Sequence, residues 1–300
     1  MSKMNRRIFI KTGVAGVAAL SVTGPAAAGI RSLLADKTAT VGTVALGSSG
    51  LIVPRMAMGT GSVGYNQSSN QTRLGMDSFL SLARRAYERG VRFYDMADGY
   101  GSHPYVAQAL KTVPRESVTL LSKIWTHEPG SDKIEPVRTT LDRFRAEVGT
   151  EYFDILLMHC MTSGGWTKSR EHYIDGLSRA KEDGIVKAVG VSCHSYDALV
   201  EAASSPWIDV IMARINPFQS KMDGTPADIS AVLKTARANG KGIIGMKIFG
   251  EGTNVREDER ETSLQYAFSQ GNVHCTTIGT ETVAQLDDAA DRVARITGLA

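Results

Sequence analysis

Four side chains with complementary acid–base chemistry lie at the ends of three successive apolar runs, or just after them. Asp95 ends the first run, and Tyr100 follows it five positions later. Lys123 and His159 follow the next two apolar runs. Because the ends of parallel strands meet at one edge of a sheet or barrel, these four groups are expected to lie together. Their types predict a site that moves a proton.

The tyrosine is the group that such a site has to tune. Its reference pKa is about 10, so a nearby cation must stabilise the phenolate before the phenol exchanges its proton readily at neutral pH. Lys123 would supply that cation, with Asp95 holding the lysine charged and oriented. His159 would hydrogen-bond a carbonyl oxygen, which the site protonates while a hydride reaches the carbon. Since protein side chains do not donate hydride, a cofactor is required.

The elements that position these residues are predicted from hydrophobic periodicity. Short runs rich in Val, Ile and Leu alternate with longer segments of helical period, which is typical of repeated βα units. Strands are predicted at 53–59, 91–95, 117–122, 153–158, 185–191, 208–213, 242–246 and 273–278, and helices near 72–89, 103–111, 134–147, 169–183, 195–204, 227–239, 259–270 and 281–296. This strict alternation favours a closed (β/α)8 barrel over an open sheet. Residues 38–52 are expected to form an N-terminal β-hairpin that plugs one end.

Other polar residues also end predicted strands, where a barrel carries its active site. They are Ser192, Asn216 and Lys247. The segment 245–252 contains Lys247 and three glycines, including Gly250, and is chemically suited to a loop that crosses a pyrophosphate.

The chain resembles the aldo-keto reductase superfamily at these residues. The family's aspartate with a tyrosine five positions on is matched by Asp95 and Tyr100, its strand-three lysine by Lys123 and its strand-four histidine by His159. Further similarity lies in the runs 46–51, 184–192 and 277–280, so that the resemblance covers nearly all of residues 40–296. It implies NAD(P)-dependent interconversion of an aldehyde or ketone and an alcohol, with Tyr100 as general acid or base.

The resemblance also implies a set of cofactor-binding residues, namely Ser192, Cys193, Asn216, Lys247, Gly250, Gly279, Thr280 and Gln285. Cys193 stands where the family commonly has an asparagine, and Met212 and Ile215 stand where a glutamine and a stacking tyrosine are usual. Gly279 and Gln285 replace a lysine and an arginine that often bind the adenosine 2′-phosphate. The expected cofactor is therefore NADP or NAD, with the preference open.

Aromatic residues on the loops after strands three and four are candidates for the wall of the substrate site. They are Trp125 and Trp166, with His127 beside them. The alternative is that they anchor their loops.

The N-terminus predicts export. Residues 1–28 carry basic residues, a mildly apolar stretch and Ala26-Ala27-Ala28, the pattern of a signal peptide. Residues 5–11 resemble the motif read by the twin-arginine machinery, the alternative being an ordinary secretory signal. We therefore expect a signal peptide at 1–28, a linker at 29–37 and the barrel at 38–300. The expected location is the bacterial periplasm, or the cytoplasm if the signal is not used.

Charge and cysteine content bound the class of partner. Residues 1–28 hold four basic and no acidic residues, so their removal changes the formal net charge from +3 to −1. A near-neutral body argues against nucleic acid as a partner. The apolar stretch of the signal is too short to span a bilayer and no other segment is long and apolar enough, so no stable membrane span is expected in the mature form. Three cysteines indicate no disulfide framework, and each is expected to be a small buried residue.

Two other functions remain open at this stage. A metal-dependent hydrolase would use histidines and cysteines around the barrel mouth, namely His103, His127, His159, Cys160, Cys193 and His194. Strand alternation opposes it, because Cys160 would point outward if His159 points inward, and no metal site is predicted. The second alternative is a regulatory barrel that binds nucleotide with weak or no turnover, which the altered residues Cys193, Met212 and Ile215 would explain.

Overall fold

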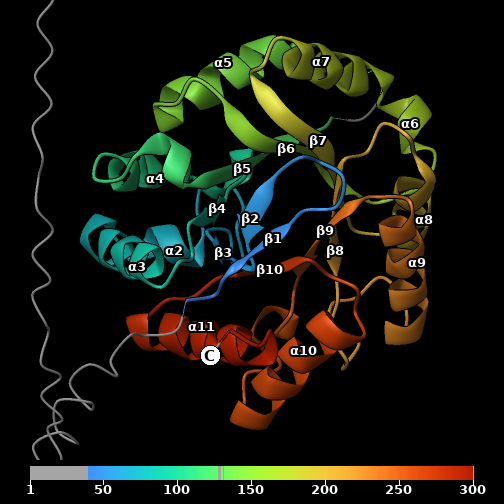
Figure 1. Cartoon of the computed structure of the whole chain (residues 1–300). Coiled ribbons are helices and arrows are strands. Elements are labelled where there is room, and N and C mark those ends of the chain that lie inside the picture. Colours follow the sequence, from blue (N-terminus) through green and yellow to red (C-terminus); the bar gives the residue numbers. More distant parts are fainter. Residues whose placement is uncertain (1–39, 128–129, 131, 300) are drawn as a thin grey trace, which may run out of the picture. The chain divides into compact units, whose positions relative to one another are not determined.

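Eight parallel strands close into a barrel in the computed structural model, which describes residues 40–127, 130 and 132–299 (Figure 1). Their circular order is β10-β3-β4-β5-β6-β7-β8-β9, so strands adjacent in the chain are adjacent in the barrel. The strands are β3 (Met56–Gly59), β4 (Phe93–Asp95), β5 (Thr119–Trp125), β6 (Phe153–Met161), β7 (Val186–Cys193), β8 (Val210–Arg214), β9 (Gly242–Met246) and β10 (Cys275–Ile278). The predicted (β/α)8 barrel with an N-terminal β-hairpin is confirmed.

Helices surround the strands (Figure 1), and the longer ones bury apolar residues against them. In α3 (Met76–Glu88) these are Phe79, Leu82, Ala83 and Ala86, the spacing of one helical face. The other helices are α2 (Asn70–Arg73), α4 (His103–Leu110), α5 (Val137–Val148), α6 (Trp166–Ser169), α7 (Glu171–Glu182), α8 (Tyr196–Ser204), α9 (Pro226–Ala238), α10 (Glu257–Ser269) and α11 (Val283–Ile296). Single 3₁₀ turns lie at η1 (Asp98–Tyr100), η2 (Arg115–Ser117) and η3 (Gly250–Gly252).

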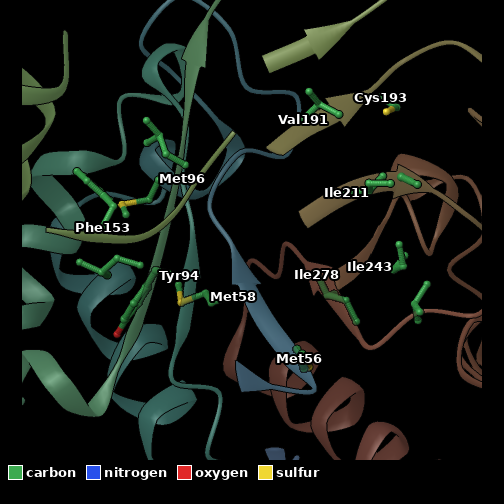
Figure 2. Packing of buried hydrophobic residues seen from close by; sticks show 14 of the residues in the cluster. Met56, Met58, Tyr94, Met96, Phe153, Val191, Cys193, Ile211, Ile243 and Ile278 are labelled. Atoms are coloured by element: carbon green, nitrogen blue, oxygen red, sulfur yellow. The ribbon is translucent and has the colours of Figure 1, made fainter. Parts of the chain in front are cut away.

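Successive residues of a strand point alternately into two apolar cores, one inside the barrel and one between the strands and the helices. In β7, Ala188 belongs to a cluster formed by barrel-interior residues, whereas Val189, Val191 and Cys193 belong to the larger cluster between strands and helices. Figure 2 shows Val191, Cys193 and Ile211 among the members of that larger cluster. This alternation fixes which strand residues reach the barrel mouth.

The hairpin of β1 (Thr43–Ala45) and β2 (Ile52–Pro54) covers the N-terminal end of the barrel. Leu46 and Val53 pack into the interior cluster, and the Ser48 N–H donates to the Gly240 carbonyl over 2.7 Å. The prediction that the first barrel strand begins at residue 53 is corrected, because that strand begins at Met56. Arg55 forms the corner, since its N–H bonds to the hairpin and its carbonyl accepts from Thr276 in the barrel.

A bulge near the end of β6 changes the direction of one cysteine. The register with β7 shifts between Met158 and Met161, and Cys160 lies there with φ of +69°. A bulge inserts a residue and breaks simple alternation. The expectations that Cys160 is fully buried and points outward are therefore corrected: it is half-buried and lies near the charges of Arg214 and Lys247. Cys193 and Cys275 are buried as expected.

In the part of the chain that the structure describes, no helix is long and apolar enough to cross a membrane. The signal peptide and linker predicted for residues 1–37 lie outside the described residues.

Candidate active site

A buried ion pair forms the base of the site. Asp95 ends β4, and Lys123 lies on the adjacent β5 with a side chain that is 1% exposed. The lysine Nζ donates to Asp95 and, over 2.8 Å, to the Met96 carbonyl, while Thr277 donates to the other aspartate oxygen over 2.8 Å. Burial opposes the charge of Lys123, but Asp95 and then Tyr100 raise the pKa of this lysine above its usual value. The ammonium group is therefore held charged.

Tyr100 lies over this pair at the end of η1. The Lys123 Nζ is 4.9 Å from the centre of the phenol ring. Burial raises the pKa of Tyr100, Lys123 opposes this rise and Asp95 adds to it. The loop after β3 packs against the ring so closely that a Cβ added at Gly61 or Gly64 would come within 2.1 Å or 2.6 Å of ring carbons. Glycine at these positions lets the backbone hold the phenol in place.

His159 faces the phenol from β6. Its Nε2 is 3.4 Å from the Tyr100 hydroxyl oxygen, and the Trp125 ring meets the imidazole edge-on with centroids 5.5 Å apart. Burial, followed by the charge of Lys123, lowers the pKa of His159 well below its usual value. The imidazole is therefore neutral at physiological pH.

A cavity of about 610 Å³ opens beside these groups. Asp95 and Tyr100 line one part of it, the loop after β9 lines another, and the residues from Thr277 to Gln285 line a third. Its volume falls in the range of sites that hold a small molecule or cofactor.

Four of the predicted cofactor residues line this cavity, namely Lys247, Gly279, Thr280 and Gln285. The Lys247 ammonium is paired with Glu251, and the Gln285 side chain accepts from the Glu281 N–H over 2.8 Å. A Cβ at Gly279 would meet the Ser62 hydroxyl at 2.1 Å, so this wall has no room for a side chain. The Thr280 hydroxyl is buried without a hydrogen-bond partner in the described part of the chain.

The other four lie outside the cavity lining. Ser192 is buried and accepts from the Cys160 N–H over 2.8 Å, while Cys193 lies in the core between strands and helices. Asn216 is buried and its side chain binds the backbone of Phe218, Ser220 and Lys247. Gly250 is buried in the turn η3. Asn216 and Gly250 shape the loops beside the cavity, and Cys193 is corrected to a core residue because strand alternation turns it outward.

The two candidate substrate-wall tryptophans have different positions. Trp125 is 45% exposed and its ring meets His159 edge-on, and its place in the substrate wall stays a prediction. Trp166 is 2% exposed, and its indole N–H donates to the Ala198 carbonyl over 3.2 Å. Its position matches the loop-anchor alternative and corrects the substrate-wall prediction.

Several cavity residues were not predicted from the sequence. They include Gly61, Ser62, Glu251, Arg260, Thr277, Glu281 and Asp288. Gly61 and Ser62 belong to a loop rich in Gly, Ser, Asn and Gln, whose composition alone gave no role. Arg260 and Asp288 lie on separate helices and form an ion pair of 2.9 Å, which sequence spacing does not predict.

The residues proposed for a metal-dependent hydrolase do not all converge, although His159 and His194 lie with ring centres 6.3 Å apart. His103 begins α4 and bonds to Glu147 of α5 and Ser122 of β5, and Cys193 lies in the core between strands and helices. Within the described ranges, no group of three or more His, Cys, Asp or Glu is arranged to hold a metal ion.

Comparison with known proteins gives the family. A model described as the Aldo/keto reductase family matches residues 55–299. This chain belongs to the aldo/keto reductase family. It is thus an oxidoreductase of a family that generally uses NAD(P)H.

Curated relatives within the family have different activities. L-galactose dehydrogenase from Arabidopsis thaliana is 24% identical over 249 residues, covering 78% of this chain and 75% of that protein. D-threo-aldose 1-dehydrogenase from a Pseudomonas species is 23% identical over 255 residues, covering 75% and 74%. The match to methylglyoxal reductase DkgB from Salmonella typhi is 30% identical over 142 residues, 46% of this chain and 51% of the relative. This last match thus spans about half the length of that reductase.

Solved structures show the same fold. An aldo-keto reductase from Pseudomonas aeruginosa superposes with a TM-score of 0.69 at 21% identity, covering 85% of this chain and 95% of that one. The holo form of an aldo-keto reductase from Bacillus halodurans gives 0.64 at 17% identity, covering 86% and 96%.

The cavity fits the cofactor that this family uses. It is lined by Tyr100 and by the residues around Gly279, where close packing leaves no room for a side chain. The buried Thr280 hydroxyl is available to bond a ligand. Lys247 also lines the cavity, and its ammonium carries a charge suited to a phosphate.

Proposed function

We propose that this reductase interconverts an aldehyde or ketone and an alcohol, with Tyr100 as the group that gives and takes the proton. The observation that carries the proposal is the position of the phenol, held over the Lys123–Asp95 pair, facing His159 and lining the cavity. Lys247, Gly279, Thr280 and Gln285 would hold the dinucleotide, which when bound supplies or accepts a hydride.

The side chains divide the proton transfer between them. Tyr100 donates its hydroxyl proton to the carbonyl oxygen, and the Lys123 ammonium stabilises the phenolate that remains. Asp95 keeps this ammonium charged and fixed in direction. His159, being neutral, donates an N–H to the same carbonyl oxygen and orients it toward the phenol. Solvent then returns a proton to Tyr100.

We propose NAD rather than NADP as the preferred cofactor. Two cations that line the cavity are already paired, Lys247 with Glu251 and Arg260 with Asp288. The Glu281 carboxylate also lines the cavity and accepts from the neutral Asn70 amide over 2.5 Å. A 2′-phosphate would add negative charge beside these carboxylates, which disfavours its binding.

The test combines turnover with binding. Full-length protein is assayed with NADH and a panel of aldehydes and ketones, and dinucleotide binding is followed separately by fluorescence. The Tyr100→Phe variant should lose 10²-fold or more in kcat, because general acid catalysis contributes about that much, and should still bind NADH. A Tyr100→Phe variant as active as the natural chain would overturn the proposed chemistry. Nucleotide binding without turnover in either protein would favour the regulatory barrel.

We propose separately that the chain is exported in its folded state through the twin-arginine pathway, on the basis of residues 5–11. Export after folding lets a protein carry a bound dinucleotide with it. Fractionation of bacteria that express the full chain should place the processed protein in the periplasm with nucleotide retained through dialysis. Changing Arg6 and Arg7 together to lysine should stop this transfer. Continued export of that variant would indicate an ordinary secretory signal.

A further inference from the structure

An arginine at the barrel mouth has no part in the proposed proton transfer. Arg214 ends β8, two positions after Met212, which belongs to the barrel interior. By alternation its side chain continues the inward face toward the C-terminal mouth. Burial, followed by the charge of Arg214, lowers the pKa of His194 to about 3. His194 in turn lies with its ring centre 6.3 Å from that of His159.

The loop after β8 is built to hold this guanidinium still. The Arg214 Nη1 donates to Asp223 over 3.0 Å, and the Asp223 side chain is only 6% exposed. The buried Asn216 accepts two backbone N–H bonds and donates two to carbonyls, which fixes the chain that leads to Asp223. Gln219 and Lys221 in this loop both have positive φ, a conformation costly for residues other than glycine.

One edge of the guanidinium is left for a ligand. Asp223 engages Nη1, while the buried Nε has no hydrogen-bond partner among the described residues. The Nδ1 of His194 and that of His159 are likewise buried and without partners there. The Arg214 Nε–H is a buried donor without a partner there, which is costly, so a ligand that accepts its bond gains free energy on binding.

We propose that Arg214 binds a carboxylate of the substrate, so that the enzyme acts on carbonyl compounds that also carry a carboxylate. The inference rests on the proposed function and adds the substrate class. The Nε–Nη2 edge of an arginine presents two parallel N–H groups that match the two oxygens of a carboxylate. Since Asp223 already balances the charge of Arg214, recognition depends on this paired hydrogen bonding rather than on net charge. A lysine, which lacks the fork, should not replace it.

The experiment compares 4-oxobutanoate with its neutral methyl ester, which presents the same aldehyde. Full-length protein with NADH should prefer the acid by tenfold or more in kcat/KM. Arg214→Gln and Arg214→Lys should each lower kcat/KM for the acid at least tenfold, mainly through KM, and leave the ester within about twofold. The double variant Arg214→Gln with Asp223→Asn removes the buried unpaired carboxylate and should behave like Arg214→Gln. Arg138→Gln, which alters an exposed ion pair on α5, is the matched control.

A binding measurement separates this inference from the proposed reaction. Succinamate and succinamide are redox-inert and differ by one carboxylate, and each is tested for thermal stabilisation of the protein with NAD⁺ present. Stabilisation by succinamate alone, lost in Arg214→Gln, supports the carboxylate site even if no aldehyde is reduced. Equal effects of the acid and the ester in turnover, or of the two amides in binding, overturn it. So does a loss in Arg214→Gln that is as large for the ester as for the acid.

Discussion

Tyr100 is surrounded by groups that act on its proton in opposite senses. Burial raises the pKa of the phenol, and Lys123 limits this rise by stabilising the phenolate. Asp95 opposes ionisation of the phenol but keeps Lys123 charged. The result suits a proton donor, because the phenol stays protonated in the resting enzyme while the cation is ready for the phenolate.

These pKa directions predict the pH dependence of turnover. Tyr100 stays protonated up to and beyond its ordinary pKa of 10, and His159 stays neutral below its ordinary 6.5. Carbonyl reduction should therefore keep a constant kcat from below pH 6.5 to about pH 10, whereas alcohol oxidation, which needs the phenolate, should rise with pH throughout. The measurement is kcat in each direction under saturation. A loss of reductive kcat centred near pH 6.5 would show that His159 titrates normally.

The carboxylate of Glu281 predicts the cofactor preference. Glu281→Gln removes a negative charge from the cavity lining and keeps the side-chain size. The ratio of the Kd for NADPH to the Kd for NADH should fall about fivefold to tenfold, equivalent to about 1 kcal/mol. Glu151→Gln, at a 92% exposed glutamate away from the cavity lining, is the control. An unchanged ratio in Glu281→Gln would remove the electrostatic argument for NAD.

At the scale of elements, the positions of strand ends explain which site residues could be predicted from the sequence and which could not. Asp95, Lys123 and His159 were predicted to lie together because each ends an apolar run, and the structure places them around Tyr100. The inward–outward alternation of β6 was predicted wrongly at Cys160, because a bulge there shifts the register. No residue type in this run indicates that the strand contains a bulge. The substrate-wall prediction for Trp166 was wrong for another reason. Its indole packs against α8 and bonds to Ala198, a contact between residues far apart in the sequence.

A glycine in β7 sets the approach of the neighbouring strand. A Cβ at Gly190 would lie 1.8 Å from the Val210 carbonyl oxygen of β8. Gly190→Ala should therefore force the two strands apart and destabilise the fold by about 1–3 kcal/mol or more. Gly99→Ala is the control, because a Cβ there meets nothing within 4 Å. The two variants are compared by urea unfolding, and equal midpoints would show that β7 and β8 adjust freely.

For the whole molecule, hydrophobic periodicity was sufficient to predict the barrel, because eight alternations leave few other ways to bury every apolar face. It did not predict the cavity, whose lining comes from β3, the loop after β9 and helices α10 and α11 together. Glu251, Arg260 and Asp288 are ordinary charged residues in sequence and acquire a place in the site only when the barrel closes.

Buried neutral histidines predict how the whole fold responds to acid. Burial lowers the pKa of His274 to about 4, with its Nδ1 accepting the Ile243 N–H, and that of His194 to about 3. Between pH 6.5 and these values the unfolded chain binds protons that the folded chain does not. The free energy of unfolding should thus be constant above pH 7 and fall as the pH drops from 6.5 toward 4. Denaturation at several pH values tests this, and His274→Gln should reduce the slope.

Leu46 and Val53 of the hairpin close the N-terminal end of the barrel interior, opposite the end that carries the candidate active site. In the described residues the barrel interior is filled with side chains, so under the proposed function nucleotide, carbonyl and alcohol would all exchange at the opposite, C-terminal face. If nucleotide and substrate share one opening, the order in which they bind and leave affects the rate. A nucleotide that leaves slowly would delay the next turnover, and excess alcohol or aldehyde bound at the opening would delay it further. We therefore expect the rate of turnover to fall at high substrate concentration.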